Sequence, residues 1–179
     1  MQRYIALAAA ILALAPNRAS AEVSDSSAGG FTIKIAIRIQ AEPAEVYRRL
    51  LRVGEWWNPQ HTFSGDARNL SIEEKAPGCF CEKLPDGGSV RHMEVVSVAP
   101  GKTLVLTGGL GPLQSIAASG PMVFRLSPDA AGTSLTVTYT VAGYLPAGLN
   151  TWAAPVDSVL SEQMVRLKNF IEKGSPAPK

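Results

Sequence analysis

Two cysteines, a histidine and a glutamate lie close together on either side of a short turn. The sequence PDGG between two alternating runs predicts an antiparallel hairpin. In the most direct register of that hairpin, Cys81 faces His92 and Cys79 faces Glu94. Thiolate, imidazole and carboxylate groups are the ligand types of a zinc site. The candidate metal cluster is therefore Cys79, Cys81, His92 and Glu94.

The same stretch has a second interpretation that involves no metal. Adjacent strand residues splay apart, whereas a closed zinc site uses a tight knuckle. A slip of the turn by one residue would also dissolve the cluster. We prefer this second interpretation, in which the small thiols pack against apolar surface, and we expect no metal and no cofactor. The direct register also pairs Glu82 with Arg91 on the opposite face of the sheet.

The two cysteines are expected to be free thiols. Two residues of extended strand advance about 6.6 Å and point both Cβ atoms to one face. A disulfide needs its Cβ atoms about 4 Å apart. A bridge between Cys79 and Cys81 would therefore require a distorted strand.

A second group of candidates lies in the segment WWNPQHTFSG, which connects a predicted helix to a predicted strand. Trp56 and Trp57 are adjacent in a loop and cannot point the same way, so we expect one in the core and the other at a cavity. Packing of both in the core is the alternative. His61 lies among hydrogen-bonding residues in a loop, which favours a role in binding. The candidates for acid–base catalysis are His61, Glu82 and His92.

Common catalytic signatures do not occur in the sequence. There is no G-x-S-x-G, no H-E-x-x-H and no Walker loop, because the GGLGPL run lacks the Gly-Lys-Ser/Thr ending. We interpret GGLGPL as a partly apolar loop at the mouth of a cavity.

The elements that must position these residues can be read from the hydrophobic pattern. Residues 31–39 alternate between apolar and polar side chains, which predicts a half-buried strand. Pro43 is suited to the first turn of a short helix. A helix of about twenty residues, which Gly174 ends, is expected near the C-terminus. The other strands are expected at Leu70–Glu74, Cys79–Leu84, Val90–Val98, Thr103–Thr107, Met122–Leu126 and Thr133–Val141.

This order predicts an α+β, helix-grip fold. A curved seven-stranded antiparallel sheet would wrap around the long C-terminal helix, with two short helices after the first strand. One helix over such a sheet leaves a space, which is a natural cavity. The residues expected to contact a ligand there are Trp56, Trp57, His61, Tyr144, Trp152, Val156, Leu160, Gln163 and Leu167.

The element order resembles the START-like (SRPBCC) superfamily over about Phe31–Lys173. The resemblance rests on AEPAEVYRRLLRVGEWWNPQHTFSG, VAPGKTLVLTGGLGPLQ, GTSLTVTYTVAGY and VDSVLSEQMVRLKNF. It is similar to the polyketide cyclase/lipid-transport branch and to the branch of chaperone-ATPase activators. The resemblance implies a fold and a cavity more firmly than it implies an activity.

The N-terminus has the pattern of a secretory signal peptide. Arg3 precedes the apolar run Ile5–Ala15, and Ala19-Ser20-Ala21 offers a cleavage site. We therefore expect a signal peptide at 1–21, a flexible lead-in at 22–30, the domain at 31–173 and a disordered tail at 174–179. The apolar run is too short to span a bilayer, so no stable membrane anchor is expected.

The charge balance argues against nucleic-acid binding. The chain has 17 Lys and Arg residues against 15 Asp and Glu residues, and loss of Arg3 and Arg18 would leave 15 against 15. A protein that binds phosphates needs a basic excess. We expect a periplasmic or secreted protein that binds a small, largely hydrophobic molecule. The alternatives are an enzyme of the cyclase, dehydratase or hydrolase kind that uses the same cavity, and a protein-interaction module.

Overall fold

The structure, a computed structural model, describes residues 20–177, and side chains from residue 22 onward. The predicted signal peptide lies outside the described residues except for Ser20 and Ala21. The last two residues of the predicted tail, 178–179, also lie outside them. None of the helices in the described part is long and apolar enough to cross a membrane.

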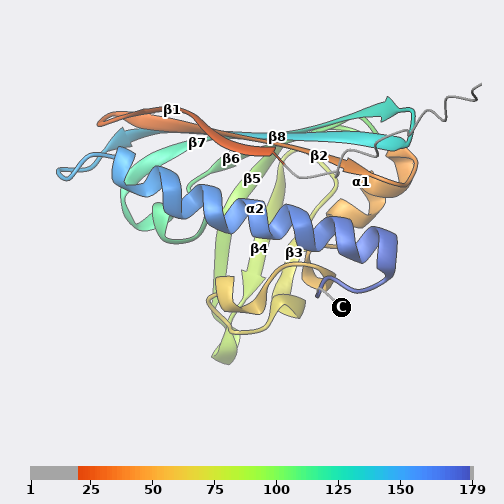
Figure 1. Cartoon of the computed structure of the whole chain (residues 1–179). Coiled ribbons are helices and arrows are strands. Elements are labelled where there is room, and N and C mark those ends of the chain that lie inside the picture. The colour runs from red at the N-terminus through yellow and green to blue at the C-terminus, as the bar shows by residue number, and fades with distance from the viewer. Residues whose placement is uncertain (1–19, 178–179) are drawn as a thin grey trace, which may run out of the picture.

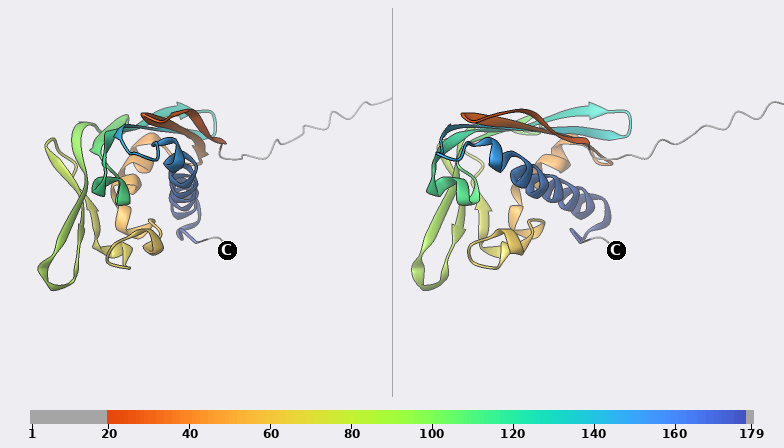
Figure 2. Two further views of the ribbon diagram at one scale, coloured as in Figure 1. Left: turned by 90° about the vertical axis from the view of Figure 1, so that its left-hand side faces the viewer. Right: turned by 60° about the vertical axis from the view of Figure 1, so that its left-hand side comes forward.

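Within the described residues the strands form one antiparallel sheet of eight strands, in the order β1-β2-β8-β7-β6-β5-β4-β3. Figure 2 shows how the sheet bends, so that β3–β5 stand at a steep angle to β1 and β2. The strands are β1 (Ser20–Ser27), β2 (Gly30–Ile39), β3 (Leu70–Ile72), β4 (Gly78–Lys83), β5 (Ser89–Ala99), β6 (Thr103–Gly108), β7 (Ala117–Asp129) and β8 (Gly132–Tyr144).

The eighth strand is β1, and it corrects the prediction of a flexible lead-in at 22–30. This strand pairs with β2 in an antiparallel hairpin, with Ser27 opposite Gly30. Among its described side chains, those of residues 22–27, all are exposed except that of Val23, which packs against the core. Backbone pairing with β2 and contact with α2 therefore hold β1 in place, and the hydrophobic pattern carries no signal for it.

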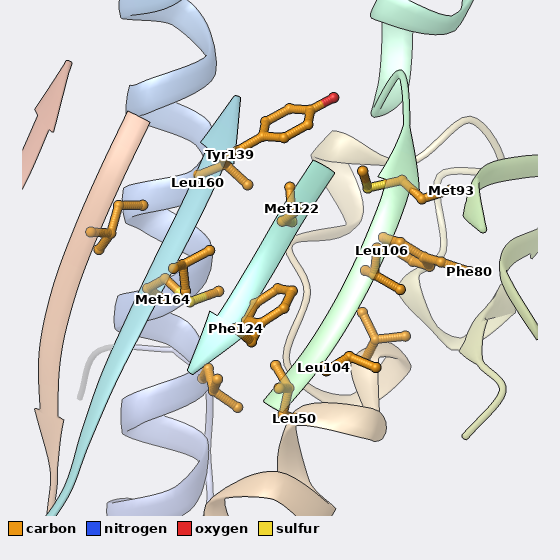
Figure 3. Packing of buried hydrophobic residues seen from close by; sticks show 14 of the residues in the cluster. Leu50, Phe80, Met93, Leu104, Leu106, Met122, Phe124, Tyr139, Leu160 and Met164 are labelled. Carbon is orange, nitrogen blue, oxygen red and sulfur yellow. The ribbon is translucent and has the colours of Figure 1, made fainter. Parts of the chain in front are cut away.

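The predicted alternation of β2 and β8 is confirmed, and the buried side chains of these two strands form one side of the core. In β2 the residues Phe31, Ile33, Ile35, Ile37 and Ile39 are buried. The neighbouring strand β8 buries its alternate side chains in the same way. Figure 3 shows part of this apolar cluster, where Leu160 and Met164 of the long helix lie near Tyr139 and Phe124 of the sheet.

The connection between β2 and β3 contains one α-helix and three short 3-10 turns. The helix α1 (Pro43–Leu51) begins at Pro43, as predicted, and is followed by η1 (Val53–Glu55), η2 (Pro59–His61) and η3 (Ala67–Asn69). The chain therefore crosses the open side of the sheet before it enters β3, and it carries the WWNPQHTFSG segment with it.

The long C-terminal helix α2 (Asn150–Lys173) lies inside the bend of the sheet (Figure 1). It packs against β1, β2 and α1. Gly174 ends it in a left-handed conformation with φ 73°, as the sequence predicts. The helix buries one stripe that includes Leu160, Met164 and Leu167.

The hairpin of β4 and β5 departs from the predicted register because β5 contains a β-bulge. Cys79 pairs with Glu94, as predicted, but Cys81 pairs with Arg91 instead of His92. His92 is the extra residue, and both His92 and Met93 are buried. The bulge therefore turns His92 to the inner face of the sheet, away from the cysteines.

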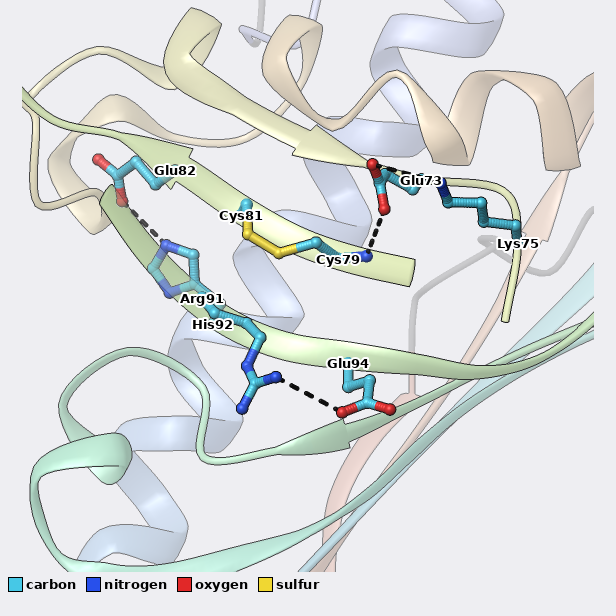
Figure 4. The surroundings of a disulfide bond; sticks show 8 residues. All are labelled: Glu73, Lys75, Cys79, Cys81, Glu82, Arg91, His92 and Glu94. Atoms are coloured by element: carbon cyan, nitrogen blue, oxygen red, sulfur yellow. Dashed lines mark hydrogen bonds and ion pairs between the residues drawn. A yellow bond between two sulfur atoms is a disulfide. The ribbon is translucent and has the colours of Figure 1, made fainter. Parts of the chain in front are cut away.

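The expectation of free thiols is also wrong, because Cys79 and Cys81 form a disulfide (Figure 4). Their Cα atoms are 5.3 Å apart. An ideal strand would separate them by about 6.6 Å, so β4 is locally contracted at this point. Both cysteines lie on the outer face of β4, whereas Phe80 and Glu82 are buried on the inner face.

We expect protein unfolded without reductant to take up no thiol reagent at Cys79 or Cys81, because both sulfurs are held in one bond. Its intact mass should be lower by two hydrogen atoms than after reduction, as mass spectrometry can measure. The reduced sample is the control and should be labelled twice. Labelling of both thiols in the unreduced sample would contradict the structure.

Candidate functional site

A cavity of about 280 Å³ lies between α2, the inner face of β4 and β5, and two loops. Most of its wall is aliphatic or aromatic, with a few polar side chains. It is lined by Trp57, Gln60, His61, Thr62, Phe63, Leu70, Phe80, His92, Leu110, Gly111, Pro112, Leu113, Trp152, Pro155, Val156, Val159 and Leu160. A mainly apolar cavity with few polar groups is typical of a small-molecule site.

The two tryptophans take different places. Trp56 is 1% exposed, and its indole N–H lies 3.1 Å from the Arg49 carbonyl and 3.2 Å from the Leu50 carbonyl. Trp57 lines the cavity, and its indole N–H donates to the carbonyl oxygen of His61. One tryptophan thus lies in the core and the other at the cavity.

The helix α2 holds the loop that forms one wall of the cavity. Gln163 accepts a hydrogen bond from the backbone N–H of Asn58 at 2.8 Å. Glu162 binds the Asn58 side chain and lies 3.2 Å from Nε2 of His61. The guanidinium of Arg166 donates to the Trp56 carbonyl at 2.9 Å. Three side chains of α2 therefore fix the position of His61 and Trp57 relative to the helix.

The opposite wall is formed by η5 (Gly111–Ser115), which follows β6 and lies in the GGLGPL run. The Tyr139 hydroxyl donates to the carbonyl of Gly108 and accepts from the N–H of Leu110, both at 3.0 Å. Burial raises the pKa of Tyr139 to about 12, so the hydroxyl keeps its proton at neutral pH. Tyr139 of β8 thus anchors the GGLGPL loop, which was predicted from the sequence to lie at the mouth of a cavity.

A buried imidazole lines the inner wall of the cavity and contacts a buried carboxylate. Glu82 is 0% exposed and His92 is 4% exposed, and their Oε2 and Nε2 atoms are 2.9 Å apart (Figure 4). The Glu82 carboxylate also accepts the backbone N–H groups of Phe63 at 3.1 Å and Ser64 at 2.5 Å. Three donors therefore satisfy a carboxylate that would otherwise be costly to bury.

The pKa values of this pair are both lowered. Burial alone would raise the pKa of Glu82, but hydrogen bonds from Ser64, Phe63 and His92 outweigh it and lower this pKa. Burial lowers the pKa of His92, and the hydrogen bond to Glu82 opposes this only in part. At neutral pH we therefore infer an ionised carboxylate that accepts the Nε2 proton of a neutral imidazole.

Two phenylalanines confine the His92 ring. Its centroid lies 5.8 Å from that of Phe63, with the rings stacked, and 5.1 Å from that of Phe80. Glu82 fixes one edge of the imidazole and the aromatic rings lie beside it, so the ring has one defined orientation at the cavity wall.

The structure places the predicted contact residues in three groups. Trp57, His61, Trp152, Val156 and Leu160 line the cavity. Trp56, Gln163 and Leu167 are buried outside its lining. Tyr144 is 72% exposed at the end of β8 and is not part of the lining.

Of the acid–base candidates, Glu82 and His92 lie in contact, although the predicted register had placed Glu82 beside Arg91. Phe63, Phe80 and Val159 also line the cavity, although they are not among the contact residues predicted from the sequence. Val159 lies on the predicted C-terminal helix next to Leu160, and the alternation of the predicted strand Cys79–Leu84 puts Phe80 on the face opposite the cysteines. Nothing in the sequence pattern placed Phe63.

The residues of the candidate metal cluster do not come together. Cys79 and Cys81 are bonded to each other on the outer face, whereas His92 is on the inner face. Among residues 20–177 there is no group of three or more His, Cys, Asp or Glu side chains arranged to hold a metal ion. The bulge at His92 is the physical reason, because it moves the imidazole to the other side of the sheet.

No protein-family model and no curated protein sequence matches the chain. Several solved structures do match. EF2215, a conserved protein of unknown function from Enterococcus faecalis, is 21% identical with a TM-score of 0.57, over 90% of this chain and 81% of that one. The Aha1 dimer from Colwellia psychrerythraea is 18% identical with a TM-score of 0.54, over 80% and 97%. CalU16 from Micromonospora echinospora is 15% identical with a TM-score of 0.53, over 88% and 87%.

The structural neighbours are START-like (SRPBCC) proteins, and at these identities the likeness shows the fold alone. The chain therefore has the START-like, helix-grip fold that the resemblance implied. The part of the chain that the structure describes forms eight strands instead of the predicted seven. The fold is consistent with a ligand-binding cavity between the sheet and α2.

The lowered pKa values predict that the protein loses stability in acid. Because the pKa of His92 is lower in the folded state than its usual 6.5, the unfolded state binds more protons below about pH 6.5. Stability is therefore lost as the pH falls from there through the folded pKa of His92. Glu82 adds a further loss as the pH falls from about 4.5 through its own lowered pKa.

Urea unfolding between pH 8 and pH 4 measures this loss. His92→Phe should flatten the part of the profile just below pH 6.5, because it removes the group whose pKa is lowered by burial. A wild-type profile that is flat from pH 7 to pH 4 would refute the assignment.

Proposed function

We propose that this protein binds a small, largely apolar molecule in the cavity between α2 and the sheet. The observation that carries the proposal is the cavity itself, which has a volume of about 280 Å³ and a wall composed mainly of aliphatic and aromatic side chains. Transferring an apolar ligand from water into such a cavity is favourable by roughly 25 cal/mol for each Å² of apolar surface that is buried.

The way in which the walls are built supports this proposal. One wall is tied to α2 through Asn58 and Gln163, and another is anchored by the Tyr139 hydroxyl. A cavity held open by hydrogen bonds in its walls does not need to be created when the ligand arrives. Pre-formed walls lower the entropy cost of binding.

A neutral apolar probe such as 2-methylnaphthalene should raise the melting temperature of the protein, increasingly with its concentration, because it binds only the folded state. Leu160→Trp should abolish this increase, because Leu160 lines the cavity and is 2% exposed, so the indole would occupy the ligand's space. Differential scanning fluorimetry measures both effects.

Val165→Trp is the matched control. Val165 is also on α2 but is 44% exposed, so its replacement should preserve the probe-induced increase. If no apolar probe changes the melting temperature and Leu160→Trp is strongly destabilising, helix and sheet meet in a solid core. The protein-interaction module would then be the better account.

We further propose that the protein is exported to the periplasm or secreted. Support comes from Arg3, the apolar run Ile5–Ala15 and the small residues Ala19-Ser20-Ala21. Cleavage after Ala21 would remove the first two residues of β1 and leave Glu22–Ser27, which still pair with β2. A disulfide such as Cys79–Cys81 also suits an oxidising compartment.

Protein expressed with its full N-terminus should therefore be recovered outside the cytoplasm with Glu22 as its first residue. N-terminal sequencing and intact mass measure this. An Ala19→Gln, Ala21→Gln double change should block processing, because signal peptidase requires small residues at these places. Recovery of unprocessed protein that begins at Met1 in the cytoplasm would contradict the proposal.

A further inference from the structure

His92 has one ring nitrogen that nothing in the described structure binds. Nε2 is held by Glu82, but Nδ1 is buried and has no hydrogen-bond partner within residues 20–177. Figure 4 shows this second nitrogen on the side of the ring that faces away from Glu82. A buried polar atom without a partner is costly, and most such atoms in proteins are satisfied by something.

The chemistry of Nδ1 is fixed by its surroundings. An ionised carboxylate can only accept hydrogen bonds, so the proton of the neutral imidazole resides on Nε2. Nδ1 then carries a lone pair and acts as an acceptor. Because Glu82 is itself held by two backbone N–H groups, the imidazole cannot easily turn to exchange its nitrogens.

The other polar groups at the cavity already have partners or lie at its rim. The Thr62 hydroxyl donates to the Pro59 carbonyl at 2.7 Å, and the Trp57 indole donates to the His61 carbonyl at 2.9 Å. His61 lies 3.2 Å from Glu162, with about one third of its side chain exposed. In the described wall, therefore, the buried acceptor that lacks a partner is Nδ1 of His92.

We propose that the ligand is a neutral, apolar molecule with one hydroxyl group, of the phenol or alcohol class, and that this hydroxyl donates a hydrogen bond to Nδ1 of His92. The proposal rests on the proposed function, because it requires a ligand in the cavity. It adds the ligand's polar group and the residue that recognises it.

The same geometry selects against anionic ligands. A carboxylate in place of the hydroxyl would meet the Nδ1 lone pair, with the negative charge of Glu82 on the far side of the ring. Binding it would require protonation of an imidazole between two aromatic rings in a buried position, which burial opposes. The cavity should therefore prefer an alcohol or phenol to a fatty or aromatic acid of the same shape.

Two probes of nearly equal shape test the proposal. 2-Naphthol carries a hydroxyl where 2-methylnaphthalene carries a methyl group, so the ratio of their dissociation constants isolates the hydroxyl. In His92→Phe this ratio should shift against 2-naphthol by about three- to tenfold relative to the wild type, which corresponds to one hydrogen bond of ordinary net strength. Because His92→Phe also removes the hydrogen bond that Nε2 donates to Glu82, any resulting change in the cavity wall affects both probes, and the ratio isolates the contribution of the hydroxyl.

Tyr144→Phe is the matched control, because it removes a hydroxyl from an exposed position outside the cavity lining and should leave the ratio unchanged. A second measurement needs no variant. Addition of 2-naphthol to the ¹⁵N-histidine-labelled wild type should move the Nδ1 resonance of His92 upfield, as an unprotonated nitrogen that accepts a hydrogen bond does, whereas 2-methylnaphthalene should not. 2-Naphthoate should bind more weakly than 2-naphthol.

The outcomes separate this proposal from the proposed function. If neither naphthalene binds to the wild type, the binding function itself fails. If both bind but the affinity ratio is the same in wild type and His92→Phe, or the Nδ1 resonance does not respond to 2-naphthol, the cavity binds apolar molecules and the role of His92 is overturned. Tighter binding of 2-naphthoate than of 2-naphthol would also overturn it.

Discussion

The candidate site depends on the hydrogen bonds that the buried carboxylate of Glu82 accepts. This carboxylate comes from β4, accepts backbone N–H groups from the loop at Phe63 and Ser64, and accepts the imidazole proton of His92 on β5. A buried charge is stable only when it is paired and hydrogen-bonded, and the donors here come from two places, the loop at Phe63 and Ser64 and the strand β5. Removing any one partner would leave the others with an unsatisfied polar group. The carboxylate therefore couples the position of the loop to the orientation of the histidine.

The bulge in β5 makes this arrangement possible, and it explains where prediction from the sequence succeeds and fails. The hairpin follows from turn chemistry and alternation, and Cys79 pairs with Glu94 as predicted, but at the turn the register differs by one residue, with Lys83 opposite Ser89. From the extra residue His92 to the turn, each side chain of β5 lies on the face of the sheet opposite to the predicted one. The bulge brings His92 to Glu82 and separates it from the cysteines. No residue type indicates a bulge at this point, so the predicted Glu82–Arg91 pair is wrong, and the metal cluster, which was the less favoured interpretation, does not form.

The fold was predictable to a greater degree than the site. Strands such as β2 bury one face against the core, so their alternation can be read directly, and the stripe of α2 can be read in the same way. The strand β1 escaped detection because it is held by backbone pairing and buries little apolar surface. The disulfide escaped detection because an ideal strand does not permit it and the local contraction of β4 does. In the site, Trp57 and Leu160 were found because they are large and apolar, whereas Phe63 depends on a loop whose course Glu82 fixes.

The two histidines at the cavity, His61 and His92, differ in burial, and this difference gives them different roles in binding. His61 and Glu162 lie at the rim, where about a third or more of each side chain is exposed, so solvent can replace either partner at little cost. His92 and Glu82 are almost inaccessible, and their geometry is maintained by backbone donors and by two aromatic rings. A ligand that hydrogen-bonds to His61 or Glu162 replaces hydrogen bonds that water already makes there, so this contact adds little selectivity. A ligand that reaches Nδ1 satisfies an atom for which the described structure provides no other partner, so recognition concentrates at the buried end of the cavity.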